Sequence, residues 1–182
     1  MRAPISLLAA AWLCLAPPPL RAQSADPAAS FGELPLGQAV RVEHGAAKRA
    51  LVVFEDPYCP HCRNLHATLA QMKDVLVFTF LIDVLDADSG EQADRIWCAP
   101  DRALALERWF SQHASVPRDP GCHAPLVQTR ALAGKLGLRG TPTILFADGS
   151  TSVGAIGQAR LEQRLREAAT GPASDDGGIR QP

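Results

Sequence analysis

The chain has 182 residues, 47% of them hydrophobic, and its 18 basic and 19 acidic side chains give a formal net charge of −1. A chain of this length has enough residues for one ordinary domain with an apolar core. The balanced charge and the lack of a basic run argue against electrostatic attraction to nucleic acid or to an anionic membrane surface. We therefore expect no nucleic acid among its partners.

Residues 1–22 have the pattern of a secretory signal peptide that is cleaved on export. Arg2 supplies the positive start, and the apolar run over residues 5–16 is too short to span a bilayer. The Ala- and Ser-rich start of the mature chain predicts a disordered linker over residues 23–38. We therefore expect a periplasmic protein.

Two strands are predicted ahead of the first motif. Residues 39–43 alternate between apolar and polar side chains, and residues 49–54 end in a strand-like apolar run. The turn signal between them, around Gly45, favours a β-hairpin. Glu55 and Asp56 follow the second strand, where we expect both carboxylates to be solvated.

A C-x-x-C motif, Cys59-Pro60-His61-Cys62, lies where this strand gives way to a helical pattern. The first backbone N–H groups of a helix have no internal partner and favour an anion, so this helix start would stabilise a Cys59 thiolate. Pro60 suits the first helical position, and His61 adds a donor or a positive charge beside Cys59. Cys62, one turn on, would attack a mixed disulfide and release the partner. The motif thus predicts a thiol–disulfide redox site.

Three other uses of the C-x-x-C pair fit the sequence less well than redox chemistry does. A zinc site could draw ligands from Cys98, Cys122 and the five histidines, but these two cysteines lie far apart, whereas zinc knuckles use closely spaced pairs. Haem attachment needs a histidine directly after the second cysteine, and Arg63 stands there. A purely structural disulfide would close a small loop of little stabilising value. We therefore expect no bound metal and no cofactor.

The rest of the chain predicts a central strand and four helices. Residues 75–82 are apolar almost throughout, which is typical of a strand in the middle of a sheet. A disordered tail is expected over residues 171–182. Helical patterns, the second of them with Asp101 as a candidate N-cap, cover residues 91–99, 102–112, 125–136 and 159–169.

Gly140-Thr141-Pro142, just before a strand-like run, is the second informative motif. Proline cannot donate a hydrogen bond to a sheet, so at a strand entrance it marks an edge or a special turn. A cis Thr141–Pro142 bond fits such a position, and a plain turn fits the local sequence equally well. Asp148-Gly149 then predicts a hairpin.

The cysteine count agrees with export. Cys14 lies in the predicted leader, so four of the five cysteines remain in the mature chain. An even number in an exported protein implies pairs. Besides the redox-like pair, Cys98 and Cys122 would make a structural bridge worth about 3 kcal/mol in a chain-entropy model.

The order of these elements resembles the thioredoxin fold, an α/β architecture, here with a helical insertion between the central strand and the strand that follows Pro142. Four motifs are similar to those in the catalytic domain of the periplasmic disulfide isomerases of the DsbC/DsbG family. The resemblance places a thioredoxin-like domain over residues 39–170. The motifs are Cys59-Pro60-His61-Cys62 with Leu65-His66 behind it, Ile96-Trp97-Cys98-Ala99, a lone Cys122, and Gly140-Thr141-Pro142 before Asp148-Gly149.

This resemblance implies a catalytic role for the C-x-x-C segment, with Cys59 as the nucleophile and Cys62 as the resolving thiol. Thr141 and a cis Pro142 would face the active site and contact the substrate. The implied protein is an enzyme, a thiol-disulfide oxidoreductase or isomerase. It would act on cysteine-containing client proteins and exchange electrons with a membrane redox partner. The resemblance also implies that Cys98 and Cys122 form a structural disulfide.

Departures from the family pattern bear on function. The family's catalytic domain follows a dimerisation domain, whereas only residues 23–50 separate the expected cleavage site from the first core strand, so we expect a monomer. The Pro-His dipeptide is the one found in the oxidase DsbA, a strong oxidant. Val53 stands where thioredoxin keeps a buried acid. His66 is expected to be a core or surface histidine, with a proton-shuttling role as the less favoured alternative.

The sequence therefore predicts an exported thiol:disulfide oxidoreductase, with oxidation, isomerisation and reduction all open as the net direction. The alternatives are a client-specific chaperone or assembly factor with secondary redox activity, a net oxidase of the DsbA type, and a metal-binding module.

Overall fold

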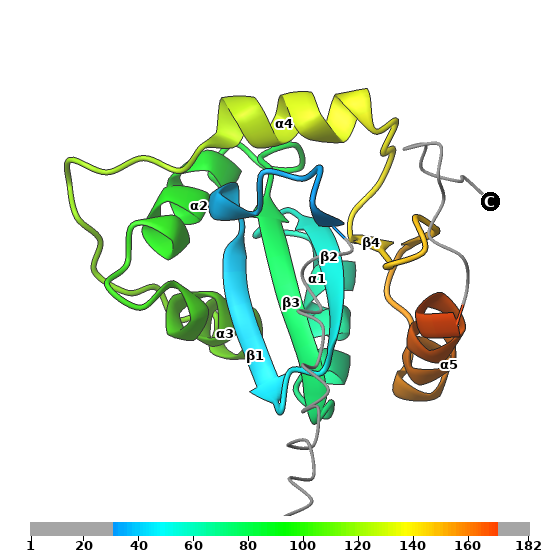
Figure 1. Cartoon of the computed structure of the whole chain (residues 1–182). Helices are drawn as coiled ribbons and strands as arrows, with labels where there is room; N and C mark the ends of the chain where they lie inside the picture. The colour runs from blue at the N-terminus through cyan, green and yellow to red at the C-terminus, as the bar shows by residue number, and fades with distance from the viewer. Residues whose placement is uncertain (1–30, 171–182) are drawn as a thin grey trace, which may run out of the picture.

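The computed structural model describes residues 31–170 and has a five-stranded mixed sheet at its centre (Figure 1). The strand order is β1-β3-β2-β4-β5, with β2 and β3 parallel and the other neighbours antiparallel. The strands are β1 (Val40–Gly45), β2 (Arg49–Glu55), β3 (Asp74–Leu81), β4 (Thr143–Leu145) and β5 (Thr151–Val153). The predicted α/β, thioredoxin-like fold is confirmed.

Five α-helices and a short 3₁₀ helix surround the sheet within the described residues. The predicted helices all form, with ends shifted by a few residues at most. Asp101 caps α3 (Arg102–Gln112) by accepting a hydrogen bond from the backbone N–H of Leu104 at 2.9 Å. None of the helices within residues 31–170 has the length and apolar character needed to cross a bilayer. The helices are η2 (Leu36–Gln38), α1 (Pro60–Leu69), α2 (Ser89–Trp97), α3 (Arg102–Gln112), α4 (Leu126–Lys135) and α5 (Gln158–Thr170).

Alternating side chains give the sheet two apolar faces. On one face, Leu51 and Val53 of β2 pack in a core with residues of α1, α2, α3 and α5. On the opposite face, Val52 and Phe54 pack in a second core with α4 and the segment that precedes β1. Helix α1, which carries Cys62, thus covers the face to which the odd-numbered residues of β2 point.

The predicted hairpin of β1 with β2 is wrong. Figure 1 shows β3 between them, and β3 pairs antiparallel with β1 and parallel with β2. Every residue of β3 after Asp74 is buried, so this strand is most stable with a partner on each edge. Gly45 marks the end of β1, with φ at 69° and no room for a side chain, because a Cβ there would lie 1.7 Å from the carbonyl oxygen of Lys73.

The linker predicted over residues 23–38 is wrong in its second half. Phe31 is 6% exposed, and Leu34 and Leu36 pack beside it on the α4 face of the sheet. This apolar face needs cover next to α4, and the three side chains supply it. The predictions for residues 1–30 and 171–182, the signal peptide and the tail among them, lie outside the described residues.

Candidate functional site

Cys59 caps the N-terminus of α1. Strand β2 ends at Glu55, a short turn follows, and the helix begins at Pro60. The Cys59 sulfur accepts a hydrogen bond from the backbone N–H of Cys62 at 3.3 Å, and Cys59 is 3% exposed. A thiolate here would face the unpaired N–H groups and the positive end of the helix dipole. The chain therefore presents a cysteine at a position that favours a sulfur anion.

Cys62 lies one turn further into α1 and has no exposed surface. Both cysteines are free thiols in this structure. Burial raises the pKa of the Cys62 thiol far above its ordinary value, and the negative charge of Glu55 and a hydrogen bond with Cys59 raise it further. Cys62 is therefore a neutral thiol at physiological pH, and its nucleophilic form needs a group that takes its proton.

The second motif lies against the first. The Cys59 thiol donates a hydrogen bond to the carbonyl oxygen of Thr141 at 3.3 Å, across 82 positions of sequence. The Thr141–Pro142 peptide bond is cis, and Pro142 is buried directly ahead of β4. The structure thus brings together the two motifs that the sequence singled out.

The remaining members of the C-x-x-C segment face solvent. Pro60 and His61 are exposed at the first helical positions. Tyr58, just before Cys59, is 39% exposed and makes an edge contact with Trp109 of α3, their ring centroids 5.3 Å apart. The Trp109 indole N–H donates to the carbonyl oxygen of Pro57 at 2.6 Å. Helix α3 therefore holds the turn that leads to Cys59 and Cys62.

The prediction that Asp56 is solvated is wrong: it has no exposed surface. Its Oδ1 atom accepts hydrogen bonds from the backbone N–H of Tyr58 at 2.9 Å and the Ser89 hydroxyl at 2.8 Å. Its Oδ2 atom accepts from the backbone N–H groups of Val84 and Leu85 at 2.7 and 2.9 Å. These four hydrogen bonds offset the cost of burying the carboxylate. They also tie the turn before Cys59 to the segment after β3.

Glu55 is also fully buried, against expectation. It is the last residue of β2, and alternation from Leu51 and Val53 turns it towards the α1 face. Its Oε1 atom lies 2.8 Å from Nε2 of His66, whose ring stacks on Phe110 with centroids 4.1 Å apart. The alternation of side chains along β2 was the sequence signal for this burial. The signal was missed because the predicted strand ended at Phe54, one residue before Glu55.

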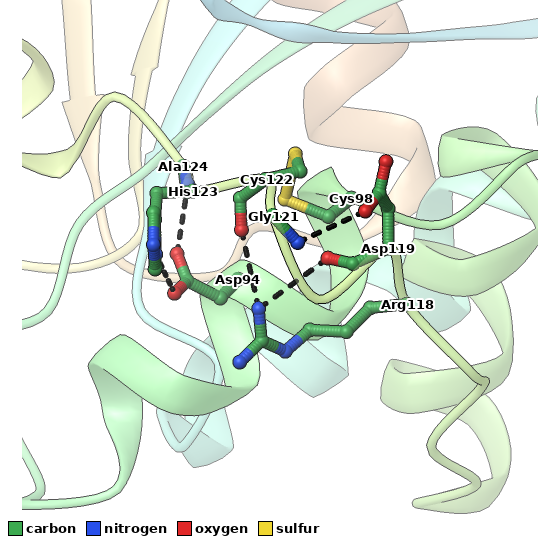
Figure 2. The surroundings of a disulfide bond; sticks show 8 residues. All are labelled: Asp94, Cys98, Arg118, Asp119, Gly121, Cys122, His123 and Ala124. Atoms are coloured by element: carbon green, nitrogen blue, oxygen red, sulfur yellow. Dashed lines mark hydrogen bonds and ion pairs between the residues drawn. A yellow bond between two sulfur atoms is a disulfide. The ribbon is translucent and has the colours of Figure 1, made fainter.

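Cys98 and Cys122 are joined in a disulfide, shown in Figure 2. Cys98 follows α2, and Cys122 lies in the loop between α3 and α4. Asp94 holds the same loop: its Oδ1 atom accepts a hydrogen bond from the backbone N–H of Ala124 at 2.7 Å, and its Oδ2 atom lies 2.9 Å from Nδ1 of His123. Two cysteines in a disulfide cannot ligate zinc, and residues 31–170 contain no cluster of three or more His, Cys, Asp or Glu side chains suited to a metal.

The fold and site define a thioredoxin-like protein with a dithiol at a helix N-terminus. A family model described as a thioredoxin-like domain matches residues 36–169, and the chain belongs to this family. It is 39% identical over 138 residues to a probable thiol:disulfide interchange protein DsbC of Bordetella avium, covering 76% of this chain and 50% of that protein. Identity to the thiol:disulfide interchange protein DsbC of Escherichia coli is 28% over 124 residues, covering 66% of this chain and 52% of that protein.

A solved structure is similar over the same region. The disulfide interchange protein from Neisseria gonorrhoeae superposes with a TM-score of 0.70 at 32% identity, covering 74% of this chain and 98% of that one. The predicted resemblance to DsbC-type proteins is therefore confirmed. The chain spans about half the length of the curated relatives it matches.

Proposed function

We propose that this protein is an exported thiol:disulfide oxidoreductase that exchanges disulfides with cysteines of client proteins, with Cys59 as nucleophile and Cys62 as resolving thiol. The observation that carries the proposal is the contrast between the two sulfurs. Cys59 lies at the helix N-terminus, where a thiolate is favoured, whereas Cys62 is a buried, protonated thiol. The first can attack a partner, and the second is kept from side reactions until a mixed disulfide forms next to it.

Exchange with a client disulfide proceeds in two steps. The Cys59 thiolate attacks one client sulfur, a Cys59–client bond forms, and the other client sulfur leaves with the electron pair of the broken bond. Cys62 then loses its proton and attacks Cys59, which releases the first client sulfur as a thiolate and leaves Cys59 and Cys62 oxidised. Run in reverse, the same steps oxidise a client dithiol.

Contacts around Cys59 support roles for the neighbouring residues. Thr141 and Pro142 would bind the client backbone, because the carbonyl oxygen of Thr141 already accepts a hydrogen bond from the Cys59 sulfur. Pro60 would start the helix, and His61 would stabilise the thiolate from the solvent side. The exposed ring of Tyr58 offers an apolar contact to the client segment around its cysteine.

The proposed action on cysteine-containing clients agrees with the relatives named as disulfide interchange proteins. We also place the protein in the periplasm, with a membrane redox partner and a monomeric state. A chaperone with secondary redox activity is the second candidate, and the exposed Tyr58, Val84 and Leu85 side chains near the redox turn favour it. A Cys59→Ser/Cys62→Ser double variant that still suppressed aggregation of a reduced client as well as wild type would support that candidate.

Trapping the mixed disulfide tests the proposal. Cys62→Ser should accumulate a covalent complex with a client that carries an accessible disulfide, because the resolving thiol is gone. Cys59→Ser should give no such complex, since its remaining thiol, Cys62, has no exposed surface and a raised pKa. Both variants should be compared by non-reducing mass mapping with client and protein at equal concentration. Equal trapping by the two variants, or trapping by neither, would contradict the assignment.

A further inference from the structure

We propose that an acidic pocket beside Cys59 binds an arginine or lysine side chain of the client, close in sequence to the client cysteine that Cys59 attacks. The inference rests on the proposed function and names a class of substrate for it. The pocket has a volume of about 330 Å³ and lies between α2, α3 and the turn before α1. Its lining includes Tyr58, Asp88, Glu91, Gln92, Arg95 and Trp109.

The charge of the pocket is the first observation. Two carboxylates, of Asp88 and Glu91, stand against one guanidinium, of Arg95, which leaves a net charge of −1 on the lining. Arg95 is already engaged, because it donates a hydrogen bond to Oε1 of Glu91 at 2.6 Å. Asp88 has the N-cap position of α2, where an aspartate ordinarily caps its helix, yet its side chain makes no capping hydrogen bond. The Asp88 carboxylate is therefore available to a cationic ligand.

A nearly buried amide is the second observation, and it is independent of the charge. Gln92 lines the pocket and is 5% exposed. Its Oε1 atom accepts a hydrogen bond from the Ser115 hydroxyl at 2.9 Å, whereas its Nε2 atom has no hydrogen-bond partner among the residues that the structure describes. A donor in such a side chain usually has a partner. A backbone carbonyl oxygen of the client would supply the partner that Nε2 lacks.

The aromatic wall of the pocket suits a cation. The rings of Tyr58 and Trp109 lie with centroids 5.3 Å apart, and Tyr58 is 39% exposed. A cation over such a ring is attracted by its π electrons, and the planar guanidinium of arginine can also bind a carboxylate through two N–H groups. Burial raises the pKa of the Tyr58 phenol, and the charges of Asp88, Asp86 and Glu91 raise it further. The ring and the carboxylates therefore act on the same space.

The pocket lies where the client segment next to the reacting cysteine would pass. Tyr58 directly precedes Cys59, so the two Cα atoms are about 3.8 Å apart. Thr141 contacts Cys59 from the side of β4, whereas α3 packs near β1, at the opposite edge of the sheet (Figure 1). A client segment that crosses Cys59 thus has Thr141 on one side and the pocket on the other. An ion pair in the pocket would hold the client cysteine in position for attack.

A synthetic peptide disulfide tests this subsite. The peptide carries one cysteine bonded to nitrothiobenzoate, whose thiol has a low pKa and leaves readily. The Cys59 thiolate attacks the peptide sulfur, a Cys59–peptide bond forms, and nitrothiobenzoate leaves with the electron pair of the broken disulfide. The absorbance of the released nitrothiobenzoate gives the rate constant of this first step for the reduced full-length chain.

Peptides of identical composition separate binding in the pocket from general charge attraction. In the near isomer the arginine is about two residues from the cysteine, on either side of it, and in the far isomer it is at the end of the peptide. The near isomer should react at least about fivefold faster, because only its guanidinium reaches both the carboxylates and the aromatic ring. Lysine in the near position should give a smaller gain, because it lacks the planar fork of arginine.

Charge variants of the protein test whether the preference depends on this pocket. Asp88→Asn/Glu91→Gln should lose the preference for the near isomer. Asp88→Lys should instead prefer a peptide with glutamate in the near position. Glu33→Gln/Glu43→Gln is the matched control, because it removes the same charge from exposed residues outside the pocket, and it should keep the wild-type preference.

The outcomes distinguish failure of the subsite from failure of the proposed function. Equal rates for the near and far isomers with the wild-type protein would overturn the subsite and leave the redox function intact. An undiminished preference in Asp88→Asn/Glu91→Gln would do the same. If the wild-type protein released no nitrothiobenzoate from any peptide, or if Cys59→Ser released it as fast as wild type, the proposed function itself would be wrong and the subsite with it.

Discussion

Burial distinguishes the two thiols of the C-x-x-C motif. Cys59 and Cys62 belong to the same helical turn and to the same core, but only Cys62 has no exposed surface and a pKa raised by burial. The C-x-x-C spacing and the strand-to-helix position could be predicted from sequence, because both depend on local patterns. The burial of Glu55 was also signalled locally, by the alternation along β2. The burial of Asp56 could not be predicted, because it depends on partners distant in sequence, such as Val84.

The raised pKa of Cys62 links the stability of the reduced protein to pH. In the unfolded chain this thiol ionises near pH 8.5, whereas in the folded chain it stays protonated well above that value. Above that pH the unfolded state holds fewer protons, so stability should fall as pH rises, by about 1.4 kcal/mol per pH unit. Urea unfolding of the reduced protein and of reduced Cys62→Ala at pH 8 and higher checks this. An equal pH dependence in the two proteins would contradict it.

His61 is expected to make the disulfide more oxidising. It is exposed at the second position of α1, close to Cys59 at the N-terminus of the helix. His61→Ala should therefore shift the equilibrium with glutathione towards the disulfide form, because the reduced state loses a stabilising donor. An exposed histidine such as His113, replaced in the same way, is the control. An unchanged equilibrium in His61→Ala would remove this residue from the mechanism.

At the scale of elements, the sequence predicted which segments form strands and helices better than it predicted how they pair. The β3 strand was recognisable by its continuous apolar run, and the α3 helix by its cap at Asp101. The position of β3 between β1 and β2 was missed, because strand pairing is decided by contacts between segments distant in sequence. The contact between Cys59 and Thr141 depends on the same topology, since β4 is the neighbour of β2.

The disulfide between Cys98 and Cys122 is expected to stabilise the helical insertion without taking part in exchange. It closes a loop with a sequence separation of 24, which corresponds to about 3 kcal/mol in a chain-entropy model. Cys98→Ala/Cys122→Ala should lower the free energy of unfolding by about that amount and keep exchange at Cys59 measurable. Chemical denaturation and the glutathione assay, run on the same sample, test both parts. A folded variant without exchange activity would show that the bridge is not merely structural.

At the scale of the whole molecule, we predict a monomer with weak isomerase activity. Both faces of the sheet are covered within residues 31–170, and the large exposed apolar residues there, Tyr58, Val84, Leu85, Leu104, Val127 and Val153, are few. A stable dimer usually buries about 1,600 Å². Light scattering should give the mass of a monomer. The rate at which the protein reactivates scrambled ribonuclease should be low compared with its rate of thiol–disulfide exchange with glutathione. A stable dimer with strong rescue would contradict this prediction.

The central claim is that Cys59 and Cys62 form a reversible redox couple poised to donate or exchange disulfides. Equilibration of the pair in glutathione buffers of known ratio, followed by acid trapping and mass mapping, measures its reduction potential. The helix N-terminus at Cys59 and the neighbouring His61 both favour the reduced state, so we expect a value less negative than about −200 mV, on the oxidising side of the glutaredoxins. A value near the −270 mV that is typical of thioredoxin, or no reversible couple between these two cysteines, would contradict the account.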